Sequence, residues 1–281
     1  MRRKLALAVL GGLVMGACSA SKRVDTEPAA VHIVATDSGY VAPDTLHEGL
    51  NHLVFENRGT TIHECMFVRL PDGMSARAYL DAVEAGYAFP EGAIDCSGPG
   101  LTSPMQRFEL WVPLEAGTYL LACWFTGHLT TTEPRTVVVH GAPRVAVTPP
   151  REDVTLKLID FRFELIGEIE TGPQTIRVEA AGPSMHEVDI FHLQEGRSVD
   201  VVRAWYASHQ RGSLPATLMG GVLDSHEIPS EVWLRREFAA GRHVLWCGMP
   251  MIQSGKESDA GAAADVSHAD AGMVLEFDVG K

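Results

Sequence analysis

The sequence predicts an all-β protein built from two similar β-sandwich domains in tandem, each with one short helix. Runs of β-branched and aromatic residues alternate with Gly, Pro, Asn and Asp turns along most of the chain, which is the pattern of strands. The two halves also repeat the same landmarks at the same offsets. With 281 residues, 46% of them hydrophobic and 21% charged, the chain has enough apolar residues to form a core in one or two domains.

The N-terminal segment is typical of a secretory signal. The basic stretch Arg2–Lys4 precedes the apolar run Leu5–Met15, which is too short to span a bilayer as a mature helix, and small residues follow at a cleavage site. The residue after that site is Cys18, and the segment resembles the lipobox of bacterial lipoproteins. The resemblance implies a signal peptide at 1–17, diacylation of Cys18 and export to the periplasm or cell surface with a lipid anchor in the bacterial membrane. An ordinary signal peptide with an incidental cysteine is the alternative.

The first domain is expected at 30–141, after a polar tether at 18–29. Its strand pattern is clearest in Val31–Val34, Leu53–Phe55 and Thr136–Val139, where β-branched and aromatic residues lie between turn residues. These runs are short and evenly distributed, as expected for a sandwich.

A second domain is expected at 152–281. The composition becomes linker-like around Pro149 and Pro150, and a new strand pattern starts at Val154–Leu158. We therefore predict a linker at 142–151 between the two domains.

Each domain is expected to contain one helix at the same place in the repeat. Ser75 and Ser198 each lie twelve residues after the histidine of a His-Glu pair. They precede the helix-like stretches Ala76–Phe89 and Val199–His209, and we interpret each serine as an N-cap.

The charge of the chain excludes one class of partner. Acidic residues number 36 against 23 Lys and Arg, which gives a net charge of -13. A chain this acidic is repelled by phosphate backbones, so we expect no nucleic-acid partner.

Both halves carry histidine and cysteine at repeated positions. Each places a His after a Gly-containing turn and a Cys about sixty residues later, and in the first half a second His follows within five residues. Thiolate and imidazole together suit copper, because two His and one Cys with a weak axial thioether stabilise both of its common oxidation states.

In the first half these residues resemble the blue-copper (cupredoxin) family. The stretch Asn57–Glu64 contains His63, and Ala116–Tyr119 leads to Cys123 and His128, with a Cys-to-His spacing like that of azurins. The resemblance implies a Greek-key sandwich of about eight strands with copper at one end, held by His63, Cys123 and His128.

The second half resembles the same family. His186 follows a Gly-containing turn, Cys247 ends a strand, and His268 precedes Met273 with the spacing of a plastocyanin-like ligand loop. The resemblance implies one copper ion in this domain, with His186, Cys247 and His268 as equatorial ligands and Met273 as the axial ligand. The ion in the first domain would be a second one.

Each half departs from the family pattern. The first lacks the axial Met, so the axial group there is absent, a Thr of the 130–132 run, or Glu133. In the second, twenty residues, Gly248–Ser267, separate Cys247 from His268 where the family has only a few. We expect this insertion to be a flexible loop whose ends stay at the site.

The remaining sulfur-bearing residues have alternative interpretations. Cys65 and Cys96 have no counterparts in the second domain. Because an exported chain meets an oxidising compartment, we expect a disulfide between them. Alternatively, Cys65 is itself a soft metal ligand. Met249 and Met251 form either a Cu(I) site of the copper-trafficking type, together with Met273 and His268, or simply fill the core.

These features predict a membrane-anchored copper-binding protein that transfers single electrons through type 1 copper to a redox protein. The alternatives are a metal-free cupredoxin-like binding or structural lipoprotein and a copper storage or delivery protein.

Multicopper oxidases need several His-x-His pairs, and two-domain nitrite reductases need a His beside the Cys. None of the twelve histidines forms such a pair, and neither Cys123 nor Cys247 has an adjacent His. We therefore do not expect an enzyme of either kind.

Overall fold

A computed structural model describes residues 29–85, 90–129, 133–143, 145–223, 231–251 and 266–280. The predicted signal peptide, Cys18 and nearly all of the tether lie outside these residues. We call 29–143 the N-terminal half and 145–280 the C-terminal half. None of the helices in the described residues is long and apolar enough to cross a membrane.

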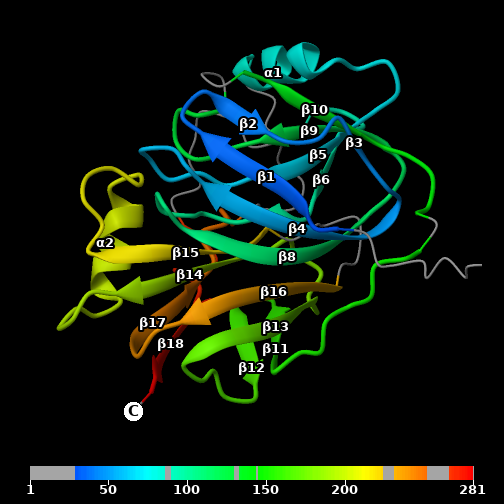
Figure 1. The fold of residues 1–281 in the computed structure, drawn as a ribbon. Coiled ribbons are helices and arrows are strands. Elements are labelled where there is room, and N and C mark those ends of the chain that lie inside the picture. Colours follow the sequence, from blue (N-terminus) through cyan, green and yellow to red (C-terminus); the bar gives the residue numbers. More distant parts are fainter. Residues whose placement is uncertain are drawn as a thin grey trace, which may run out of the picture.

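The described residues form mainly strands in both halves (Figure 1). The elements of the N-terminal half are β1 (Val31–Thr36), β2 (Gly39–Val41), β3 (Thr45–Leu46), β4 (Gly49–Asn57), β5 (Met66–Leu70), α1 (Ala76–Glu84), β6 (Ile94–Cys96), β7 (Gly98–Pro99), β8 (Arg107–Leu114), β9 (Gly117–Ala122) and β10 (Arg135–Val139). Those of the C-terminal half are β11 (Val154–Ile159), β12 (Arg162–Ile166), β13 (Gly172–Ala180), β14 (Glu187–Leu193), α2 (Asp200–Ala207), β15 (Ala216–Leu223), β16 (Glu231–Phe238), β17 (Gly241–Trp246) and β18 (Val274–Val279). The predicted all-β class, with one short helix in each half, is confirmed.

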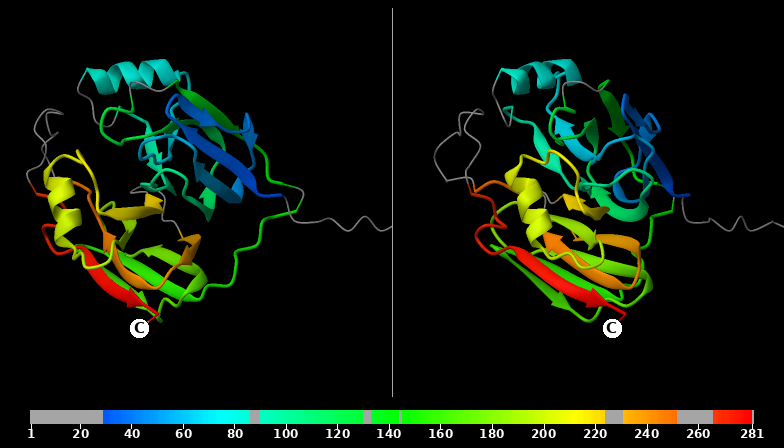
Figure 2. Two further views of the ribbon diagram at one scale, coloured as in Figure 1. Left: turned by 60° about the vertical axis from the view of Figure 1, so that its left-hand side comes forward. Right: turned by 90° about the vertical axis from the view of Figure 1, so that its left-hand side faces the viewer.

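Each half is a two-layered sandwich, and one layer is shared (Figure 2). The shared sheet has the order β12-β11-β13-β16-β8-β4-β1-β2, and β16 and β8 join the halves, with Trp233 opposite Trp111. The second layers are β3-β10-β9-β5-β6 and β18-β17-β14-β15-β7. β10 ends at Val139 and β11 begins at Val154, and the bounds of the two domains and of the linker between them stay a prediction.

A second junction pairs β7 of the N-terminal half with β15 of the C-terminal half. Pro99 lies opposite Val222, and the Gly100 amide donates to the Gly221 carbonyl at 3.0 Å. A Cβ atom at Gly221 would lie 1.8 Å from the Val188 carbonyl oxygen, so only glycine fits there. The halves are therefore joined by backbone pairing at two places.

The two helices differ in how they begin. The Ser75 hydroxyl accepts from the Ala78 amide at 3.1 Å, so Ser75 is the N-cap of α1 as predicted. In α2 the N-cap is Val199, without a side-chain cap bond, and the prediction for Ser198 is wrong. The Ser198 hydroxyl lies one position too early and instead donates to the Asp200 carboxylate at 2.9 Å.

The apolar core extends through both sandwiches. Its largest cluster includes residues from both layers of each half, such as Phe55 and Phe67 in the first and Leu156 and Leu245 in the second. A smaller cluster lies under α2 and contains Trp205 and Trp246.

Candidate metal centres

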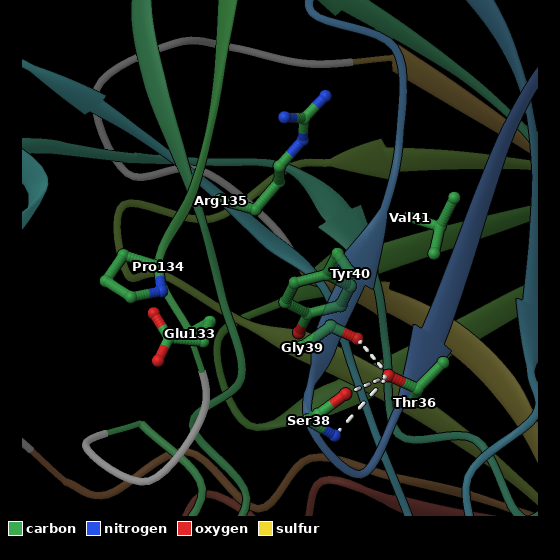
Figure 3. A pocket seen from close by; sticks show the side chains of 8 residues that line it. All are labelled: Thr36, Ser38, Gly39, Tyr40, Val41, Glu133, Pro134 and Arg135. Atoms are coloured by element: carbon green, nitrogen blue, oxygen red, sulfur yellow. Dashed lines mark hydrogen bonds between the residues drawn. The ribbon is translucent and has the colours of Figure 1, made fainter.

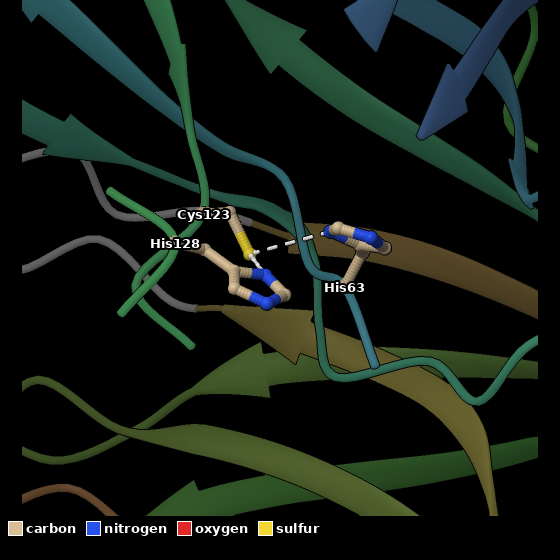
Figure 4. A group of neighbouring side chains, drawn as sticks. All are labelled: His63, Cys123 and His128. Atoms are coloured by element: carbon tan, nitrogen blue, oxygen red, sulfur yellow. Dashed lines mark hydrogen bonds between the residues drawn. The ribbon is translucent and has the colours of Figure 1, made fainter. Parts of the chain in front are cut away.

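The first candidate centre brings together His63, Cys123 and His128 at one end of the N-terminal sandwich (Figure 4). His63 lies between β4 and β5, Cys123 directly follows β9, and His128 lies in the turn beyond it. The Cys123 Sγ atom is 3.9 Å from His63 Nδ1 and 3.4 Å from His128 Nδ1. His63 and Cys123 are buried, whereas His128 is partly exposed.

The second candidate centre brings together His186, Cys247 and His268 at the equivalent end of the C-terminal sandwich. His186 directly precedes β14, Cys247 directly follows β17, and His268 precedes β18. The Cys247 Sγ atom is 3.5 Å from His268 Nδ1, which is 3.1 Å from His186 Nδ1. All three side chains are buried.

The predicted insertion does not separate the ligands of the second centre. The His268 amide donates to the Met249 carbonyl at 2.8 Å, and the Ala269 amide donates to the Cys247 carbonyl at 2.9 Å. Pro250 and Ser267 also form an isolated β-bridge. These backbone contacts close the base of the insertion, and residues 252–265 lie outside the described part.

Both donor sets fit a trigonally coordinated metal ion. Bonds of about 2.0–2.3 Å at 120° place the donor atoms roughly 3.5–3.8 Å apart, and the distances above lie between 3.1 and 3.9 Å. In each centre two imidazoles present Nδ1 and one cysteine presents Sγ, which is the equatorial set of a type 1 copper site. Burial raises the pKa of the Cys123 thiol to about 12 and raises that of Cys247 further. Metal binding would therefore displace a proton from each thiol.

The residues predicted as axial ligands lie at different places relative to their centres. Met273 is fully buried, its amide donates to the His268 carbonyl at 2.9 Å, and its carbonyl accepts from the Cys247 amide at 3.2 Å. Met273 thus adjoins two ligands through its backbone. Glu133 is exposed, is not grouped with the first centre, and lines a surface pocket together with Tyr40 (Figure 3). Residues 130–132 lie outside the described part.

Two carboxylates that the sequence analysis missed support the first histidine of each centre. Asp37 Oδ1 lies 3.3 Å from His63 Nε2, and Asp160 Oδ1 lies 3.0 Å from His186 Nε2. Each aspartate precedes its histidine by 26 residues. A carboxylate that accepts from Nε2 fixes the tautomer that leaves Nδ1 free to bind a metal ion. The equal offset in the two halves was the signal available in the sequence.

The electrostatics of these pairs agree with that role. Hydrogen bonds from the Thr60 hydroxyl and amide lower the pKa of Asp37 to about 2. For Asp160, burial opposes the shift, but hydrogen bonds from His186 and Ser184 lower the pKa overall. Burial lowers the pKa of both His63 and His186, which favours neutral imidazole, the form that binds metals. Hydrogen bonds to the aspartates and burial of the histidines therefore favour an ionised carboxylate beside a neutral imidazole.

A second repeated contact holds the residue after each cysteine. The Glu64 carboxylate accepts from the Trp124 amide, and the Glu187 carboxylate accepts from the Gly248 amide, each at 2.7 Å. Burial raises the pKa of Glu64 to about 8 and raises that of Glu187 well above its ordinary value. Both centres therefore have the same backbone support behind the cysteine.

The remaining cysteines do not form the expected bond. Cys65 and Cys96 are separate buried thiols, so the predicted disulfide is absent from the structure. The β5–β6 ladder places Phe67 opposite Cys96, and the Cys65 amide donates to the Pro99 carbonyl, so the two cysteines are not direct partners across the ladder. Cys65 does not join the first centre either. Met249 packs against the main core.

No protein-family model matches the chain, and no curated protein matches it. Among solved structures, it is similar to auracyanin A, described as a "blue" copper protein, from Chloroflexus aurantiacus, with 19% identity, a TM-score of 0.29, and coverage of 40% of this chain and 99% of that chain. It is also similar to a multicopper oxidase, with 14% identity, a TM-score of 0.25, and coverage of 88% and 87%. A Cu-containing nitrite reductase from Thermus scotoductus has 11% identity, a TM-score of 0.23, and coverage of 89% of this chain and 61% of that chain.

With identities of 11–19% and TM-scores below 0.3, these likenesses carry no argument about the function of this chain. The two groups of side chains are candidate copper sites because of their own donor atoms, two imidazole nitrogens and one cysteine sulfur in each. The comparisons also correct one expectation. Multicopper oxidases and nitrite reductases were not expected because their extra histidines are missing from the sequence, but solved structures of both kinds of enzyme are among the matches. The exclusion of an enzyme is therefore withdrawn.

Proposed function

We propose that this chain is an exported, lipid-anchored copper protein that transfers single electrons at two type 1 copper sites. The observation that carries the proposal is the recurrence of one donor set, two Nδ1 atoms and one Sγ atom, in both halves. When bound, copper would supply the one-electron chemistry. The chain supplies a nearly closed ligand set, so little movement is needed when the charge of the ion changes.

The surroundings of the ligands support electron transfer over loose metal storage. Each first histidine is fixed by a carboxylate at Nε2, and each cysteine ends a strand of a rigid sandwich. His128 is the partly exposed ligand, and we propose that a redox protein partner meets the chain there. The lipid at Cys18 would keep the protein at the periplasmic or cell-surface side of the membrane.

The experiment for the metal sites is the visible spectrum of the soluble portion of the chain, from Ser19 onward, loaded with copper. Only a short copper–thiolate bond gives intense absorption at the red end of the spectrum, so the band reports coordinated cysteine. We expect Cys123→Ser to remove the contribution of the first site and Cys247→Ser that of the second. Cys96→Ser is the matched control, since it replaces a buried cysteine outside both sites.

Each alternative has its own outcome in the same experiment. Colourless, copper-free protein with free thiols at Cys123 and Cys247 would decide for a metal-free binding module. Bound copper without the thiolate band and without reversible oxidation would decide for storage or delivery. The anchor is tested separately: we expect Cys18→Ala to move intact protein from the membrane fraction to the soluble fraction, and continued membrane retention would contradict the lipid anchor.

A further inference from the structure

A continuous row of aromatic rings leads from the first candidate centre into the C-terminal half. The Phe125 ring lies 5.0 Å from the ring of His128, a ligand of the first centre. On its other side Phe125 stacks on Trp205, with ring centroids 6.2 Å apart and planes 19° apart. The row therefore crosses from one half to the other at the contact between Phe125 and Trp205.

The same row continues to the second candidate centre. The Trp205 ring lies 5.2 Å from Tyr206, and Tyr206 stacks on Trp246 at 5.1 Å with planes 19° apart. Trp246 is the last residue of β17 and is directly followed by Cys247, a ligand of the second centre. The distances here join ring centroids, so the ring edges are in packing contact.

These rings are held in place by the packing between the halves. Phe125, from the ligand loop of the first centre, packs against the smaller apolar cluster that contains Trp205 and Trp246. Trp205 and Trp246 are 4% and 1% exposed, so their orientation is fixed. The Tyr206 hydroxyl donates to the Asp189 carboxylate at 2.7 Å, which fixes the third ring.

The two centres differ in their access to the outside. The first has one partly exposed ligand, His128, whereas all three ligands of the second are buried. An external redox partner can therefore approach the first centre closely, and the second centre depends on a route through the protein. Electron tunnelling weakens steeply with distance across empty space and less steeply through bonded or closely packed atoms, so the aromatic row is the favoured medium.

We propose that Phe125, Trp205, Tyr206 and Trp246 form an internal relay that passes one electron between the two centres. The relay rests on the proposed function, because it requires copper at both sites. In each transfer one centre is oxidised by one electron and the other is reduced by one electron. No bond is formed or broken, and no further reactant is needed. The chain then acts as a two-centre conductor with its external contact at the first centre.

The test is the rate of internal electron transfer in the full mature chain with copper at both centres. A pulse of an external reductant reduces the first centre, and the following phase, independent of protein concentration, reports transfer to the second. The signals of the two centres are assigned with the Cys123→Ser and Cys247→Ser variants. We expect Phe125→Leu and Trp205→Leu to slow this phase several-fold while both centres keep their spectra and potentials.

Phe191→Leu is the matched control. Phe191 is fully buried and its ring contacts both Trp205 and Tyr206 at 6.4 Å, but it does not lie between the centres. Its replacement also removes one aromatic ring that packs in this cluster, but not a ring of the row, so the internal phase should keep its rate. Phe125→Leu changes a partly exposed side chain and keeps the test valid if Trp205→Leu does not fold.

Copper-free protein gives a second readout. The stack of Phe125 on Trp205 predicts ring-current shifts of the Phe125 resonances in NMR spectra, lost in Trp205→Leu and kept in Phe191→Leu. Absence of these shifts in the unaltered protein would overturn the relay. So would loaded protein with no internal phase, or an internal phase unchanged in Phe125→Leu and Trp205→Leu. Failure of either centre to give a copper–thiolate band would overturn the proposed function itself, and the relay with it.

Discussion

Asp189 is a buried carboxyl group at the junction of the two halves, and its replacement by asparagine tests how charge affects that junction. Its side chain is 0% exposed; Oδ1 accepts from the Leu101 amide of the N-terminal half at 3.1 Å, and Oδ2 accepts from the Tyr206 hydroxyl at 2.7 Å. Burial raises the pKa of Asp189 from 3.8 to about 7, although both hydrogen bonds oppose this shift.

The sign of the effect on stability follows from proton binding. Between pH 3.8 and about 7 the unfolded chain has lost the Asp189 proton while the folded chain retains it. The unfolded state thus binds fewer protons, and the free energy of unfolding falls as the pH rises. At about 1.4 kcal/mol for each unit of pKa difference, the loss across this window is on the order of 4 kcal/mol. The contribution is complete below pH 3.8 and gone above about pH 7.

The assay is urea unfolding of copper-free protein between about pH 4 and pH 8, followed by tryptophan fluorescence. We expect Asp189→Asn to remove much of the fall in stability with pH, because asparagine has a similar shape and does not ionise. Glu64 and Glu187, whose pKa values are also raised by burial, remain and leave a residual slope. Asp81→Asn, which changes an exposed carboxylate on α1, should leave the profile unchanged. Equal slopes in the unaltered protein and in Asp189→Asn would refute the reasoning.

Three further predictions follow from the sites and the helices. Asp160→Asn and Asp37→Asn should each weaken copper binding at their own centre by about 10–100-fold, measured by competition with a chelator, and unchanged affinity would contradict a supporting role. Met273→Leu should keep the thiolate band of the second centre but change its potential, measured by redox titration, because an axial thioether bond is weak. Ser75→Ala should lower the free energy of unfolding by about 1 kcal/mol, whereas Ser198→Ala should have a smaller effect since it is not an N-cap; equal losses would refute this.

The sequence predicted the class of fold and the two groups of side chains that the structure brings together, because short strand patterns and repeated offsets are visible along the chain. Short runs such as Thr136–Val139 alternate with turn residues, and strands form where β-branched residues are bounded in this way. The repeated offsets indicated that His63 and His186 are equivalent, because a duplicated fold keeps the same arrangement of residues within each half. The histidine beyond each cysteine was found by its spacing, and even the long insertion did not displace His268.

Features that depend on pairing over long distances had at most a weak signal in the sequence. Asp37 and Asp160 lie in ordinary turns, and only the folded sandwich brings them to the histidines. The disulfide was expected from two private cysteines, but the register of β5 and β6 decides which residues face each other. Sharing of a sheet through β8 and β16 has no local signal, because a strand edge does not specify its neighbour.

The equivalent helices of the two halves pack in different places, so the two halves do not contribute in the same way to the contact between them. In sequence α1 and α2 are equivalent, but α1 contributes Tyr79 and Leu80 to a cluster formed mainly by its own half. By contrast, Trp205 on α2 stacks on Phe125 from the ligand loop of the other half. A tandem repeat with one head-to-tail contact has distinct ends. The two centres, although built from the same residue types, also differ in exposure, with one partly exposed ligand at the first and three buried ligands at the second.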